Sequence, residues 1–170
     1  IDEASETETF FRIGAVVKNR RWKDTTFILQ SGKKLNERRA TISVYFREAE
    51  DTLCEGGTQC HMQNVLRFTI QPEEGIRLTF WSRKPGFSAE MEERTMSFAY
   101  DGEKAKASPD AYEYVLYRAL QGDQMLFRTP KEEKYSWKFV QEALHAWRQV
   151  PVMHYAQGSD PEAIINSQQT

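Results

Sequence analysis

Apolar and polar residues alternate along most of the first two thirds of the chain. The alternation runs through residues 11–17, 42–46, 66–70, 76–80 and 96–100, and residues 27–29 add a short apolar run. Successive side chains of a strand point to opposite faces, so a period of two predicts β-strands. Short links such as residues 71–75 favour antiparallel pairing over helical crossovers. We therefore expect one large, mostly antiparallel sheet.

Two large aromatic residues interrupt the polar half of this alternation. Tyr45 and Trp81 occupy positions that are expected to face away from the core. An apolar outer face indicates that something covers it. A partner subunit and a second domain are the two alternatives.

The last third of the chain has apolar residues at helical spacing. Ser108 and Pro109 predict the start of a first helix, as its N-cap and first helical residue, with Asp110 as an early acid. The apolar stripe of this helix consists of Tyr112, Val115, Leu116, Ala119 and Leu120. Gly122 predicts its end.

A second helix is predicted from a capping box at Thr129 and Glu132, with Pro130 between them. Its apolar stripe consists of Trp137, Val140, Leu144 and Trp147. Two amphipathic helices on one side of an antiparallel sheet define an α+β fold. We expect residues 1–150 to form one domain and residues 151–170, which lack periodicity, to form an extended C-terminal tail.

Composition and charge narrow the range of functions. The chain has 170 residues and a formal net charge of −2, which gives no electrostatic reason to bind nucleic acid or an anionic membrane. Cys54, Cys60 and His61 offer at most three metal ligands, whereas a structural zinc site needs four. We expect no metal, and we interpret the two cysteines as reduced thiols of a cytoplasmic protein.

Candidate catalytic groups do not form a recognisable set. His145 lies beside the stripe of the second helix and His154 lies in the tail, and neither has metalloprotease spacing. The chain lacks the G-x-S-x-G nucleophile motif and the G-x-G-x-x-G dinucleotide motif. We expect no complete catalytic machinery in these residues.

The densest chemical feature is the loop that follows residues 27–29. It places Lys33, Lys34, Arg38 and Arg39 close to Gly32, and cationic donors of this kind can bind a phosphate or sugar hydroxyls. A solvated basic turn is the alternative, and composition alone favours it.

The order of short motifs in the chain resembles that of the glucose-6-phosphate dehydrogenase family. The matching segments span roughly residues 7–158. They are TETF (7–10), NRRW (19–22), FILQSGKKL (27–35), QPEEG (71–75), KPG (84–86), PDAYE (109–113), GDQ (122–124) with Phe127, and SW (136–137).

This resemblance implies a two-domain enzyme that oxidises glucose 6-phosphate to 6-phosphogluconolactone in the pentose phosphate pathway. Its N-terminal Rossmann domain binds NADP and carries the catalytic His/Asp pair, and this chain resembles the C-terminal domain, whose sheet joins subunits in a homodimer or homotetramer. The resemblance implies that Lys33, Arg38 and Gln71 contact the substrate, and that no catalytic residue lies in this chain.

Some family members hold a second, structural NADP in this domain. At the corresponding positions the chain has Gln30, Thr69 and Thr79, so Arg39 is the one basic candidate for that site. The segment Gly158-Ser159-Asp160-Pro161 resembles the family's Gly-Ser-Trp-Gly-Pro only in part.

Two hypotheses follow for the function. The first is the substrate-binding and dimerisation domain of an NADP-dependent dehydrogenase, inactive when isolated. The second is a stand-alone, non-catalytic module that binds a sugar phosphate or mediates oligomerisation. The absence of an initial Met favours the first.

Overall fold

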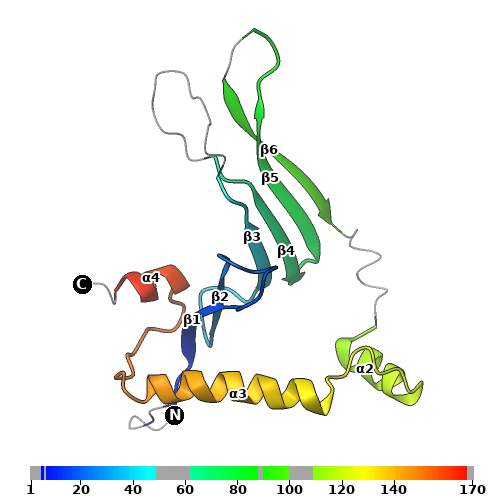
Figure 1. Cartoon of the computed structure of the whole chain (residues 1–170), viewed down its shortest axis with the longest axis vertical. Coiled ribbons are helices and arrows are strands. Elements are labelled where there is room, and N and C mark those ends of the chain that lie inside the picture. The colour runs from blue at the N-terminus through cyan, green and yellow to red at the C-terminus, as the bar shows by residue number, and fades with distance from the viewer. Residues whose placement is uncertain (1–4, 6, 49–61, 88–89, 100–108, 168–170) are drawn as a thin grey trace. The chain divides into compact units, whose positions relative to one another are not determined.

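The computed structural model describes residues 5, 7–48, 62–87, 90–99 and 109–167 (Figure 1). Cys54, Cys60, His61 and Ser108 lie outside these ranges. The strands are β1 (Phe10–Val16), β2 (Thr26–Gly32), β3 (Ala40–Tyr45), β4 (Val65–Gln71), β5 (Gly75–Arg83) and β6 (Met91–Ala99). The helices are α2 (Ala111–Leu120), α3 (Pro130–Trp147) and α4 (Pro161–Asn166). The chain divides into two compact units, residues 1–37 with 110–170 and residues 38–109.

All pairing between the described strands is antiparallel, as the alternation predicts, and the α+β class is confirmed. The strands are divided between two sheets rather than joined in one. β1 pairs with β2, from Phe10 opposite Gly32 to Val16 opposite Thr26, in the first unit. β3, β4, β5 and β6 form a four-stranded meander in the second (Figure 1).

The four-stranded sheet has one apolar and one largely polar face. The strand register aligns Ile42, Phe68, Ile76 and Phe98 in one row across all four strands. The neighbouring row, on the opposite face, consists of Ser43, Arg67, Arg77 and Ser97. Because side chains alternate along each strand, this register separates the two kinds of residue cleanly.

Both faces of this sheet are exposed in the described structure. On the apolar face, Ile42 and Phe98 are 55% and 54% exposed. On the opposite face Tyr45 is 61% exposed and Trp81 is half-buried, which confirms that both aromatic residues lie away from the apolar row. Among the described residues only Pro161 and Ile164 are buried. Exposed apolar surface on this scale is typical of faces to which another domain or subunit binds.

Helix α2 begins two residues later than the sequence pattern predicts. Its N-cap is Asp110, whose carboxylate accepts the Tyr112 N–H at 2.8 Å, and Glu113 completes a capping box. The prediction of Ser108 as N-cap is therefore wrong, and Pro109 precedes the helix. An Asp caps a helix as well as a Ser does, and here the Glu three residues later decides between them.

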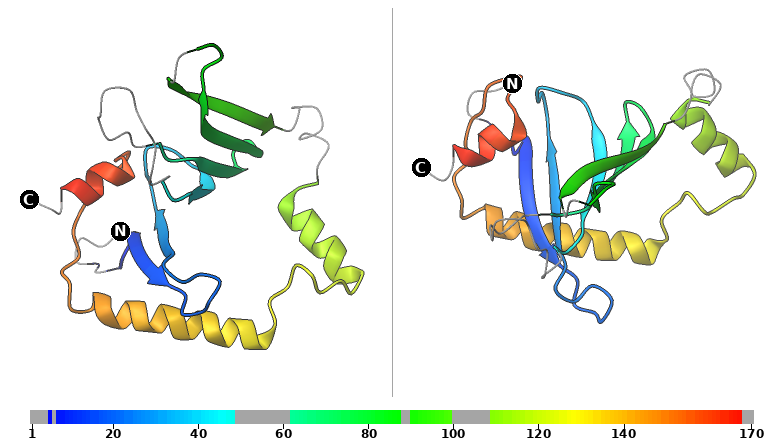
Figure 2. Two further views of the ribbon diagram at one scale, coloured as in Figure 1. Left: turned by 45° about the horizontal axis from the view of Figure 1, so that its top comes forward. Right: turned by 90° about the horizontal axis from the view of Figure 1, so that it is seen from above.

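Helix α3 begins at its predicted capping box. The Thr129 N–H donates to the Glu132 carboxylate at 2.7 Å, and this bond, with a second from the Thr129 hydroxyl, lowers the pKa of Glu132. The last turn of α3 lies beside β1, where the rings of Trp147 and Phe11 are 5.9 Å apart (Figure 2). That the helices cover one side of the four-stranded sheet stays a prediction.

A methyl group at Gly75 is expected to destabilise the four-stranded sheet. An added Cβ would lie 2.8 Å from the backbone oxygen of Phe98, which cannot swing aside as a side chain can. Gly75→Ala should cost on the order of 1–3 kcal/mol and lower the thermal midpoint of unfolding. Gly14→Ala is the matched control, since its nearest atom beyond its chain neighbours is a side-chain carbon 4.0 Å away. Equal melting of the two variants would contradict the strand contact.

Candidate functional site

The basic loop begins where β2 ends, and its first residue is held by the backbone of the residue before β1. The Lys33 N–H donates to the Thr9 carbonyl at 2.8 Å. The absence of a side chain at Gly32 leaves room for the side chains of Phe10 and Leu35, which would lie 2.7 and 2.8 Å from a Cβ there. Lys34 follows with a φ of 50°, a left-handed conformation that turns the chain away from the direction of β2.

A distant segment closes over this loop. The Gly158 N–H donates to the Lys34 carbonyl at 2.8 Å, and the Asn36 N–H donates to the Ser159 carbonyl at 3.1 Å. The Asn36 side-chain amide also donates to the Asp160 carboxylate at 3.2 Å. We call residues 155–160 the C-terminal clasp. These bonds satisfy backbone polar groups of the loop that lie beyond the end of the β1–β2 pairing.

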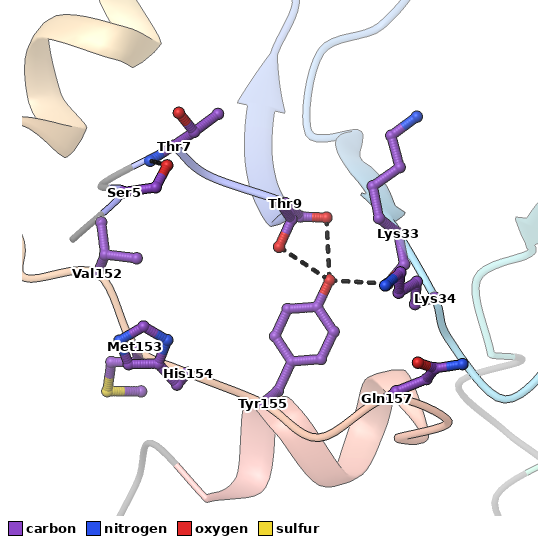
Figure 3. A pocket seen from close by; sticks show the side chains of 10 residues that line it. All are labelled: Ser5, Thr7, Thr9, Lys33, Lys34, Val152, Met153, His154, Tyr155 and Gln157. Atoms are coloured by element: carbon purple, nitrogen blue, oxygen red, sulfur yellow. Dashed lines mark hydrogen bonds between the residues drawn. The ribbon is translucent and has the colours of Figure 1, made fainter. Parts of the chain in front are cut away.

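Tyr155 is the first residue of the clasp, and its side chain contacts both the residue before β1 and the loop after β2. Its hydroxyl oxygen lies 2.8 Å from the Lys33 carbonyl and 3.1 Å from both the carbonyl and the hydroxyl oxygen of Thr9 (Figure 3). Its ring meets Phe10 edge-on with the ring centroids 6.0 Å apart. One side chain thus joins the start of β1, the end of β2 and the C-terminal segment.

Helix α4 fixes the far end of the clasp. Asp160 is its N-cap and accepts the N–H of Glu162 at 2.8 Å. The Glu162 carboxylate pairs with Arg12 of β1 at 3.2 Å, and Ile164 is 8% exposed. Residues 161–166, within the segment predicted as an extended tail, are therefore helical.

A pocket of about 950 Å³ opens beside Lys33. Its lining consists of Ser5, Thr7, Thr9, Lys33, Lys34, Val152, Met153, His154, Tyr155 and Gln157 (Figure 3). The polar members of this lining are two lysines, four residues with hydroxyl groups, one histidine and one glutamine, and no described lining residue is acidic. That chemistry suits an anion that carries hydroxyl groups.

The other predicted site residues lie in the second unit. Gln71 pairs with Ala40 at the first position of β3, directly after Arg39 and two residues after Arg38. The register therefore brings Arg38, Arg39 and Gln71 to the same end of the β3–β4 pair. All three are exposed, and the Gln71–Pro72 peptide bond is cis. The roles of Lys33, Arg38 and Gln71 as ligand contacts stay predictions, as does that of Arg39.

The remaining candidates do not form a second site among the described residues. His145 lies in the last turn of α3, and His154 lines the pocket. No group of three His, Cys, Asp or Glu side chains within the described ranges is placed to hold a metal ion. In the same part of the chain, no helix is long and apolar enough to cross a membrane.

The sequence analysis missed Tyr155, Thr9 and Gln157 as residues around Lys33. The Tyr155 hydroxyl donates to the backbone carbonyls of Lys33 and Thr9 and lies within hydrogen-bond distance of the Thr9 hydroxyl. Such bonds leave no periodic pattern. The available signals are the match of residues 7–10, which contain Thr9, and the partial match of residues 158–161, just after Tyr155, to family motifs.

Comparisons with known proteins agree on one family. Residues 1–168 match the model of the family described as "Glucose-6-phosphate dehydrogenase, C-terminal domain". A glucose-6-phosphate 1-dehydrogenase of Borreliella burgdorferi is 32% identical over 163 residues, covering 96% of this chain and 34% of that protein. One from Chlamydia trachomatis is 34% identical over 164 residues, covering 94% of this chain and 37% of that protein.

A solved structure gives the same result. A glucose-6-phosphate dehydrogenase in complex with its substrate glucose 6-phosphate superposes with a TM-score of 0.74 at 28% identity, covering 93% of this chain and 33% of that one. The chain thus spans about a third of the length of these relatives.

Proposed function

This chain belongs to the glucose-6-phosphate dehydrogenase C-terminal domain family, and from that premise we propose that it is the substrate-binding and dimerisation domain of an NADP-dependent glucose-6-phosphate dehydrogenase. The enzyme oxidises glucose 6-phosphate to 6-phosphogluconolactone in the pentose phosphate pathway, in the cytoplasm. One observation carries the proposal: the family match covers residues 1–168, nearly the whole chain. The pocket beside Lys33, whose described lining residues include two lysines and no acid, supports it.

The substrate contacts follow from chemistry that suits a sugar phosphate. The Lys33 ammonium makes no hydrogen bond or ion pair with any other described residue and is exposed. It can therefore pair with the phosphate. Arg38, in the second unit, has a guanidinium of the kind that binds phosphate, and the Gln71 amide can both donate to and accept from sugar hydroxyls. Hydrogen bonds that involve a charged group are roughly twice as strong as neutral ones.

The remaining parts of the reaction belong to a second domain. We propose that a Rossmann domain outside these residues binds NADP and supplies the base that takes the C1 hydroxyl proton while hydride passes to the nicotinamide. This division of labour fits a chain without the G-x-G-x-x-G motif. Arg39 is the candidate contact for any second NADP held by this domain.

The test is to assay the longer protein that contains this chain. It should reduce NADP in the presence of glucose 6-phosphate and fail with glucose, since the phosphate provides the contact for Lys33 and Arg38. Binding of glucose 6-phosphate without NADP reduction would instead indicate the non-catalytic module. If the protein shows neither binding nor turnover, both the dehydrogenase domain and the sugar-phosphate-binding module are refuted.

Subunit association is proposed to cover the sheet face that bears Tyr45 and Trp81. Tyr45→Glu should then shift the longer protein toward monomer in sedimentation velocity, because a buried unpaired carboxylate costs several kcal/mol. Tyr135→Glu is a matched control, since Tyr45 and Tyr135 are each 61% exposed but Tyr135 lies on α3. Unchanged sedimentation of the Tyr45 variant would place the interface elsewhere.

A further inference from the structure

We propose that Tyr155 is a positioning residue for the substrate site, acting through Lys33. Its hydroxyl ties the C-terminal clasp to the loop that carries the lysine, so a residue 122 positions along the chain sets the affinity for the sugar phosphate. The inference rests on the proposed function. It concerns a residue that does not itself need to contact the substrate.

Both backbone polar groups of Lys33 are held. Its N–H donates to the Thr9 carbonyl at 2.8 Å, and its carbonyl accepts from the Tyr155 hydroxyl at 2.8 Å. A phenol carries one proton, and the shortest of its contacts is the one to Lys33. The Thr9 hydroxyl, 3.1 Å away, can in turn donate to the Tyr155 oxygen. With both peptide groups fixed, only side-chain rotation remains to place the ammonium.

The next residues of the loop depend on the same clasp. The Lys34 carbonyl accepts from the Gly158 N–H, and the Asn36 N–H donates to Ser159. Lys34 has a φ of 50°, a conformation that a non-glycine residue adopts at an energetic cost and keeps only when its surroundings hold it. Release of the clasp would let this loop relax and would move Lys33 with it.

The hydroxyl can be tested separately from the ring. The ring packs edge-on against Phe10, and Tyr155 is only half-buried, so Tyr155→Phe keeps the packing and removes the hydrogen bonds. Since one hydrogen bond is lost to Lys33, we expect the KM for glucose 6-phosphate to rise about 3- to 10-fold in the longer enzyme. The kcat and the KM for NADP should change less than about twofold, because the lost bond orients a substrate-binding residue and no reacting atom.

Two controls make the experiment specific. Tyr135→Phe makes the same chemical change on an exposed ring of α3 and should leave every kinetic constant unchanged. The double variant Lys33→Ala/Tyr155→Phe should have the KM of Lys33→Ala alone, because a residue that acts through Lys33 has nothing to position once the ammonium is gone. A generally loosened fold would instead add its effect in either background.

The outcomes separate this inference from the proposed function. If the wild-type enzyme does not oxidise glucose 6-phosphate, the proposed function fails. If it does, and Lys33→Ala raises the KM, an unchanged KM in Tyr155→Phe overturns the positioning role alone. Additive effects in the double variant, or a lower kcat at constant KM, also overturn it. Thermal unfolding of each variant, with and without glucose 6-phosphate, verifies that the kinetics come from folded enzyme.

Discussion

Lys33→Ala is expected to raise the KM for glucose 6-phosphate about 10- to 100-fold in the longer enzyme. A hydrogen bond between an ammonium and a phosphate contributes about 1.5–3 kcal/mol, and Lys33 is exposed beside the pocket with no described partner for its ammonium. Loss of this bond weakens the binding of the ground-state substrate and of the transition state equally, so kcat should stay nearly constant. The KM for NADP should also stay unchanged. Initial rates at varied concentrations of each substrate provide the measurement.

Lys34→Ala is the control for local charge. Lys34 neighbours Lys33 and lines the same pocket, and alanine at a φ of 50° is no more strained than lysine. If Lys33 binds the phosphate directly, Lys34→Ala should change the KM by a few-fold at most. Equal effects of the two substitutions would mean that the pocket uses diffuse positive potential, and an unchanged KM in Lys33→Ala would remove that residue from the site.

The strands could be predicted because each one depends on a local pattern, the alternation of apolar and polar residues. A row such as Ile42, Phe68, Ile76 and Phe98 requires an apolar residue at every second position of each strand, and that requirement is visible in the sequence. The starts of the helices could be predicted nearly as well, since a helix N-cap depends on only four adjacent residues. The error at α2 arose because Ser108 and Asp110 satisfy the same rule, and only the capping box with Glu113 distinguishes them.

The division into two sheets could not be predicted, because it depends on pairing between segments rather than on the local pattern of each strand. Alternation shows where strands lie but not which strands share a sheet. The loop after β2 bonds to residues 158 and 159 through backbone groups, and backbone hydrogen bonds make no demand on side-chain type. The C-terminal clasp was not predicted for the same reason: backbone hydrogen bonds leave no sequence pattern, and a segment without hydrophobic periodicity is interpreted as a tail. Side chains contribute to the clasp through Tyr155 and through the Asn36–Asp160 hydrogen bond, and such single residues leave no periodic pattern in the sequence.

The candidate site, too, could be predicted from the sequence only in part. Composition alone favoured a solvated basic turn for residues 31–39, and the resemblance to a family selected Lys33 and Arg38. The structure adds what neither argument contained: Lys33 has both of its peptide groups bonded, whereas its ammonium has no partner among the described residues. A fixed backbone and an unpaired charge are what a ligand contact requires.

The 170-residue chain on its own is expected to produce no NADPH from NADP and glucose 6-phosphate at any substrate concentration. It lacks the Gly-rich motif that would hold the pyrophosphate of NADP, and the described residues of the pocket lining include no carboxylate that could orient a histidine as base. Hydride transfer needs donor and acceptor carbons held in contact, and such positioning supplies about 7–11 kcal/mol of the barrier reduction in enzymes. A chain that binds only one of the two reactants cannot provide it. Measured rates should therefore equal the rate without protein.

The inactive chain should still recognise the sugar phosphate, because the clasp, Lys33 and the pocket all lie within its first unit. Titration calorimetry of the isolated chain with glucose 6-phosphate should show binding that is lost in Lys33→Ala, whereas NADP turnover stays at zero in both. The longer protein, prepared in parallel, controls for the assay. Turnover by the rigorously purified chain would overturn the assignment of the base and the nicotinamide site to another domain. Binding unaffected by Lys33→Ala would leave Arg38 as the candidate phosphate contact.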